Sequence, residues 1–138
     1  MELVKRAASE NRGTDRGIFL AELAAEIEAD RQALRDVMAE LEVSPDRLKI
    51  AAGWLGEKGG RLKLNGQLIG YSPLSALVEL EVLALGIHGK LGLWRALLEL
   101  EDERVSEARL AELVARAESQ RDQVEAYRLE AARIALGS

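Results

Sequence analysis

Apolar residues recur at every third or fourth position over most of this chain, a pattern that predicts long amphipathic helices. The clearest stretch runs from about residue 15 to residue 42. Its apolar side chains follow a seven-residue repeat with intervening seam positions, as in a coiled coil: Leu20, Leu23, Ile27, Leu34, Val37 and Leu41. The remaining seam position is Asp30, so we expect a carboxylate to point inward where an apolar side chain would normally pack.

The last predicted helix covers about residues 105–136 and carries a second seven-residue repeat. Its inward positions are apolar or aromatic: Leu110, Leu113, Ala117, Val124, Tyr127, Ala131 and Ile134. The seam position between the first three and the last four is Gln120. Each of these two long helices therefore carries one polar residue on its inward face, Asp30 on the first and Gln120 on the second.

A third segment is apolar almost all round. It opens at Ser72–Pro73, where serine suits the N-cap and proline suits the first helical position, and it reaches about Glu101. A helix that is apolar on every face is normally surrounded by other helices. We therefore expect this segment to be the core helix of the protein.

Two further helices are predicted before the core helix. Residues 1–11 form a short apolar-faced helix, and the pattern leaves open whether this helix begins earlier than the chain does. Ser44–Pro45 opens a longer helix that we expect to end near Leu64. The alternating leucines around Asn65–Gly66 leave a hairpin over residues 61–69 as the alternative.

These segments predict one all-α domain over residues 1–138, an up-and-down bundle of four long helices preceded by a short one. The composition fits an ordinary globular protein, with 48% hydrophobic and 31% charged residues. Aromatic residues make up only 4%, so the core must be built from Leu, Ala, Val and Ile.

Cysteine is absent from the sequence, which excludes disulfides, thiolate metal sites and cysteine nucleophiles. The chain opens without an apolar signal segment, and no stretch approaches the ~20 apolar residues that a membrane span needs. We therefore expect a cytoplasmic protein that makes no contact with a membrane. The net charge is −5, which argues against binding to the phosphate backbone of nucleic acid.

Carboxylates and a single histidine supply the candidate chemistry. Glu26 and Asp30 continue a stripe of acids spaced four residues apart, a pattern that is usually a solvated face, although the seam position of Asp30 points inward. Glu81 and His88 lie seven residues apart on one face of the core helix, with Arg95 seven further on. A lone histidine cannot build a histidine-rich metal site, so a core histidine hydrogen-bonded to a carboxylate is the simpler interpretation.

The sequence contains neither a Gly-x-Ser-x-Gly elbow nor a phosphate loop. We therefore expect no catalytic residues and no cofactor, and the protein is not expected to be an enzyme.

Over most of its length the chain resembles the ferritin-like helical bundles, and within them a bacterial branch that lacks the di-iron histidines. The stretches that carry the resemblance are AGWLGEK at 52–58, LALGIHGKLGLWRAL at 83–97, AESQR at 117–121 and RLEAAR at 128–133. Di-iron members of that superfamily place a Glu-x-x-His pair on two of their helices. Here Glu118 is followed three residues later by Arg121, whose permanent charge opposes a bound cation. The resemblance therefore implies a bundle without the di-iron centre, in which Arg121 pairs the inward carboxylates.

The resulting candidate binding site is an interior polar cluster of six residues, without a metal: Glu26, Asp30, Glu81, His88, Glu118 and Arg121. The first interpretation of function is a non-enzymatic bundle that acts by association, either as a homo-oligomer or with a protein partner. The alternative is a ferritin-like protein that binds iron or manganese through those acids. A third is a winged-helix DNA-binding domain, with residues 23–35 as the helix-turn-helix and 61–69 as the wing. The uninterrupted seven-residue repeat and the acidic charge argue against this last interpretation.

Overall fold

The computed structural model describes residues 15–44, 46–47 and 72–137. Over these ranges the chain forms three long helices, α2 (Asp15–Glu40), α4 (Pro73–Glu99) and α5 (Glu107–Leu136). Each helix begins and ends within two residues of the bounds that the hydrophobic pattern predicts. The all-α class is therefore confirmed for the described part of the chain.

The predicted architecture, a ferritin-like bundle of four long helices preceded by a short one, is contradicted, because three helices make up the described residues. The expected helix at 1–11, most of the expected helix at 44–64, and the segment 61–69 lie outside those residues. A seven-residue repeat identifies a helix and its inward face. It carries no information on how many helices share one core, since that number depends on contacts between distant segments.

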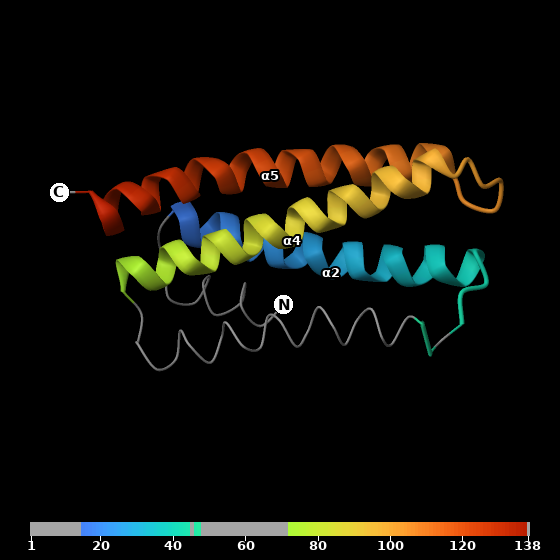
Figure 1. Cartoon of the computed structure of the whole chain (residues 1–138), viewed down its shortest axis with the longest axis horizontal. Helices are drawn as coiled ribbons and strands as arrows, with labels where there is room; N and C mark the ends of the chain where they lie inside the picture. Colours follow the sequence, from blue (N-terminus) through green and yellow to red (C-terminus); the bar gives the residue numbers. More distant parts are fainter. Residues whose placement is uncertain (1–14, 45, 48–71, 138) are drawn as a thin grey trace.

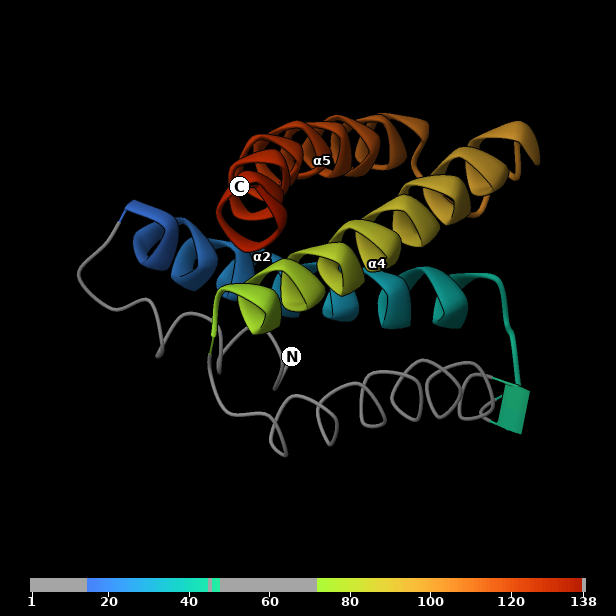
Figure 2. The same cartoon turned by 60° about the vertical axis from the view of Figure 1, so that its left-hand side comes forward.

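α2 and α4 run in the same direction, and α5 runs antiparallel to both (Figure 1). Residues 100–106 connect α4 to α5, which lie side by side along their length in both views. Figure 2 shows the three helices from a second side. Buried residues of α2, α4 and α5 belong to the same apolar clusters. Side chains from all three helices thus meet in one interior.

Within the described residues, the apolar interior forms two clusters, one at each end of the three helices. The first contains Phe19, Leu20, Leu23, Ala24, Leu77, Leu80, Leu83, Ile87, Val124 and Ala131. The second contains Ala33, Val37, Leu91, Trp94, Leu97, Val105, Leu110, Leu113 and Ala117. In the first cluster the rings of Phe19 and Tyr127 stack with their centroids 5.0 Å apart, joining α2 to α5. Eight of these 19 residues occupy seam positions predicted from the two repeats, and most of the others come from α4. Ile134, also a predicted seam position, is exposed.

Serine caps fix where α4 and α5 begin. The backbone N–H of Ser75 donates to Oγ of Ser72 at 3.2 Å, and the backbone N–H of Arg109 donates to Oγ of Ser106 at the same distance. These bonds satisfy N–H groups that have no partner within the first helical turn. Pro73 follows the first cap, at the position where its missing N–H does no harm.

The end of α2 is closed by a left-handed residue and by a side chain from the α4–α5 connection. Glu42 has φ 59°, and the backbone N–H groups of Glu42 and Val43 donate to the carbonyls of Ala39 and Met38. This is a Schellman motif in which glutamate occupies the position that usually holds glycine. Nη1 of Arg104 donates to the carbonyl of Leu41 at 3.3 Å, so the connection between α4 and α5 is held against the end of α2.

Candidate functional site

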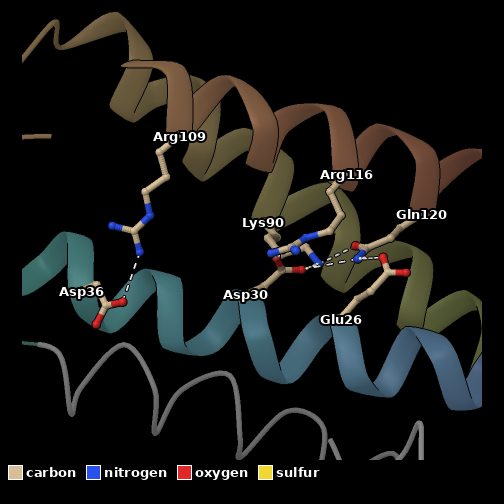
Figure 3. Close-up of polar contacts among 7 residues, drawn as sticks. All are labelled: Glu26, Asp30, Asp36, Lys90, Arg109, Arg116 and Gln120. Carbon is tan, nitrogen blue, oxygen red and sulfur yellow. Dashed lines mark hydrogen bonds and ion pairs between the residues drawn. The ribbon is translucent and has the colours of Figure 1, made fainter. Parts of the chain in front are cut away.

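A carboxylate lies inside the bundle at the boundary between the two apolar clusters. Asp30 is only 3% exposed, as its seam position on α2 predicts. Nε of Arg116, on α5, donates to its Oδ1 at 2.9 Å, and Nη2 of Arg116 contacts the same oxygen. Nζ of Lys90, on α4, donates to Oδ2 at 2.7 Å. Asp30 therefore joins all three helices through two cations (Figure 3).

Gln120 completes this group of polar side chains. It is 1% exposed, its Nε2 donates to Oε1 of Glu26 at 2.9 Å, and its Oε1 accepts from Nζ of Lys90 at 2.5 Å. The Nε2 also lies 3.4 Å from Oδ2 of Asp30. We call these five residues the polar layer: Glu26, Asp30, Lys90, Arg116 and Gln120. Its two carboxylates balance its two cations, and Figure 3 shows the side chains converging from the three helices.

The geometry of the polar layer determines what it can do chemically. Both oxygens of Asp30 accept hydrogen bonds from cations, so the carboxylate is already neutralised and hydrogen-bonded. A buried ion pair with satisfied partners adds little net stability over apolar packing, but it specifies which side chains must meet. The polar layer therefore aligns α2, α4 and α5 in one register.

The structure brings together two of the six predicted site residues, Glu26 and Asp30, and places the other four elsewhere. Glu81 pairs with Arg128 at 2.9 Å, and Glu118 pairs with Arg95 at 3.6 Å. His88 is exposed, and the expected hydrogen bond to a core carboxylate is absent from the described part of the chain.

Arg121 was expected to neutralise the inward acids, and instead it pairs with Asp122 at 3.1 Å. Its place is taken by Arg116 and Lys90, which the sequence interpretation missed. Arg116 stands four residues before Gln120 and thus on the same face of α5, a spacing that could have pointed to it. The sequence holds no comparable signal for Lys90, because its contact with Asp30 spans 60 residues.

The metal-binding and the winged-helix interpretations each require a particular arrangement of residues. A metal site would need Glu26, Asp30, Glu81, His88 and Glu118 to converge on one point, whereas their partners lie in separate places along the bundle. No group of three or more possible metal ligands occurs in the described ranges. Residues 23–35 lie within the unbroken helix α2, so the turn of a helix-turn-helix is missing there. The proposed wing at 61–69 lies outside the described residues.

A second candidate site lies on the surface of α4. This helix was expected to be surrounded, but one of its faces is exposed: Leu74 by 47%, Val78 by 38% and Leu85 by 71%. At 100° per residue, these three side chains share one stripe with Gly89, Gly92 and Ala96, which are also exposed. We call this stripe the outer face of α4: Leu74, Val78, Leu85, Gly89, Gly92 and Ala96. A Cβ built on Gly89 or Gly92 would meet nothing within 4 Å.

Charged side chains border the outer face where α4 meets α5. Near its first half, Arg128 donates to Oε1 of Glu81 at 2.9 Å and to the two oxygens of Glu125 at 2.8 and 2.6 Å. The hydrogen bonds from Arg128 lower the pKa of Glu125. In return Glu125, and to a smaller extent Glu81, raise the pKa of Arg128. Near the second half stand Arg95 and its partner Glu118. Along the border, α4 therefore contributes a carboxylate, Glu81, beside the first half of the outer face and a cation, Arg95, beside the second half.

A shallow depression of about 250 Å³ lies where α2 and α4 begin and α5 ends. It is lined by Arg16, Ser72, Pro73, Ala76, Ala131 and Ile134. The hydroxyl of Ser72 already caps α4, so this lining offers no pair of groups suited to acid–base or nucleophilic chemistry.

None of the described helices is both long and apolar enough to cross a membrane. Comparison of the chain with protein-family models, with curated proteins and with solved structures found no match.

Proposed function

We propose that this protein acts by association, through the outer face of α4, rather than by catalysis. The observation that carries the proposal is the exposure of Leu85, at 71%, in the middle of a stripe where bulky and small apolar residues follow one another. Contiguous apolar surface bordered by charge is the usual mark of an interaction site on a protein. The interior needs none of these side chains, because both apolar clusters are built from other faces of the helices.

The polar layer supports the same proposal from the inside of the bundle. Asp30, Lys90 and Gln120 are engaged with one another, so the interior acts as a scaffold that fixes the three helices. A helix held in one register by such contacts presents its outward side chains at defined spacings, as a binding surface requires. The outer face is thus a rigid surface rather than a mobile loop.

Photo-crosslinking in living cells tests the proposal. A photoreactive phenylalanine analogue replaces Leu85 in one variant and Ala115, an exposed residue of α5 away from the outer face, in the other. After irradiation we expect a discrete protein adduct from position 85 and none from position 115. The absence of any adduct from position 85, or equal adducts from both positions, would contradict association through this face.

A further inference from the structure

We infer that the partner of the outer face is a second copy of this chain, packed antiparallel about a twofold axis that passes through the level of His88. The inference rests on the proposed function, because it names the occupant of the same surface. It is drawn from two features of α4: the order of bulky and small residues along the outer face, and the order of the charges along its border.

The order of side-chain sizes makes the outer face complementary to itself. Its first half carries Leu74, Val78 and Leu85, and its second half carries Gly89, Gly92 and Ala96. An antiparallel pair centred on residue 88 places residue 88 − n of one copy opposite residue 88 + n of the other. Leu85 then inserts between Gly89 and Gly92 of the second copy. Leu85 of each copy thus meets small residues of the other on both sides of the axis, as an isologous contact requires.

The same arrangement brings Val78 between Ala96 and Leu100 of the second copy. Leu100 is exposed by 65% at the end of α4, so this contact covers a second apolar side chain. The same arrangement also explains why glycine occupies positions 89 and 92. Each weakens the helix by roughly 1 kcal/mol relative to alanine, and packing within the chain does not require either, because a Cβ there would meet open space. Glycine does permit the close approach of another helix.

The charges select the antiparallel orientation. Glu81 and Arg95 each lie seven residues from His88, about 10.5 Å along the helix in opposite directions. A twofold axis at His88 therefore sets Glu81 of each copy opposite Arg95 of the other. Their partners on α5 follow, so that Arg128 comes to face Glu118. A parallel pair would set Glu81 against Glu81 and Leu85 against Leu85, which opposes like charges and large side chains.

The area of the outer face of α4 sets the affinity that we expect for the dimer. From Leu74 to Leu100 the face is about 40 Å long, and a helix is about 10 Å wide, which gives roughly 400 Å² for each copy. Stable dimers usually bury about 800 Å² for each partner. We therefore expect a weak and reversible dimer, with a Kd in roughly the micromolar range.

Single cysteines test the geometry on the full purified chain, which has no cysteine of its own. Cysteines form a disulfide only when their Cα atoms come within about 7 Å. Under mild oxidation, His88→Cys should become a covalent dimer of twice 15.1 kDa, far faster than the exposed control Ala115→Cys. A mixture of Glu81→Cys and Arg95→Cys should link to each other more than to themselves. Equal rates for positions 88 and 115, or self-linkage at position 81, would overturn the inference.

A pair of glycine variants gives a second test that does not depend on oxidation. Gly86 and Gly89 are both exposed with open space around a Cβ, but only Gly89 lies on the outer face. Sedimentation velocity should show Gly89→Leu as a monomer at concentrations where the wild type and Gly86→Leu dimerise. If the purified chain is monomeric while position 85 still forms adducts of another mass in cells, the second copy is the wrong partner and association stands. If position 85 forms no adduct at all, both proposals fail.

Discussion

Asp30 and Arg116 stand 86 residues apart in the sequence, yet Nε of Arg116 lies 2.9 Å from Oδ1 of Asp30 across the interior of the bundle. This ion pair, together with Lys90, lies between two apolar clusters that could otherwise slide past one another. Leucine-rich surfaces can pack in several registers, whereas a buried carboxylate is satisfied only where its cations are. We therefore regard the polar layer as the feature that specifies one arrangement of α2, α4 and α5.

Removal of the buried carboxylate should be costly. In Asp30→Ala, Lys90 and Gln120 lose their shared acceptor inside the bundle, and we expect the free energy of unfolding to fall by about 3 kcal/mol. The matched control is Asp36→Ala, on the same helix, whose carboxylate pairs with Arg109 at 3.1 Å in a more exposed position (Figure 3). A surface pair of this kind should contribute less than about 1 kcal/mol. Urea unfolding measures both.

A combined variant tests whether the stability lost in Asp30→Ala comes from polar groups left unpaired in the interior. Replacing Asp30 with Leu, Lys90 with Met and Gln120 with Leu removes three members of the polar layer together. Only the two more exposed members, Glu26 and Arg116, then remain, so the stability lost in Asp30→Ala should largely return. Equal effects of Asp30→Ala and Asp36→Ala would show that the polar layer does not hold the helices together.

The left-handed residue at the end of α2 predicts a stabilising substitution. Glu42 adopts φ 59°, which is unfavourable for any residue with a Cβ, and its charge lies beside the negative end of the helix. Glu42→Gly should raise the free energy of unfolding by about 1 kcal/mol. Ala39→Gly, within the same helix three residues earlier, should lower it by a similar amount. If both glycines destabilise the protein, Glu42 does not occupy the left-handed position in solution.

The Asp102–Arg104 pair in the α4–α5 connection predicts a measurable titration. Side-chain and backbone hydrogen bonds from Arg104 lower the pKa of Asp102 to about 2. Because the folded-state pKa lies below the unfolded value of about 3.9, the pair stabilises the fold above about pH 4, and this contribution is lost as the pH falls towards 2. In Arg104→Gln the pKa should return towards its ordinary value. Carboxyl NMR titration reports both values, and a wild-type midpoint near 4 would contradict the pairing.

The sequence predicts local features of this protein well. The seven-residue repeats locate α2 and α5, and Ser72–Pro73 marks the start of α4, because caps and periodicity act over a few neighbouring residues. The same repeats single out Asp30 and Gln120 as inward polar residues, and the structure places both in one polar layer.

What the sequence could not supply is the pairing between distant residues. The choice of Arg121 over Arg116 as the partner of Asp30 follows from a family resemblance, and a difference of five residues turns a side chain to another face of α5. The hydrophobicity of α4 likewise suggested complete burial. Counting apolar residues cannot distinguish a helix that is covered on every side from one with an exposed apolar face, as the 71% exposure of Leu85 shows.

The most direct test of association through the outer face combines two readings of one variant, Leu85→Lys. The photoreactive residue is placed at position 78, on the same face, and the adduct formed in cells is compared with and without Leu85→Lys, alongside the free energy of unfolding of the two proteins. We predict that the adduct disappears while the stability changes by less than about 0.5 kcal/mol, as for other exposed positions. An undiminished adduct would contradict association through Leu85. A loss of several kcal/mol in the free energy of unfolding would show that Leu85 serves the fold and not a partner.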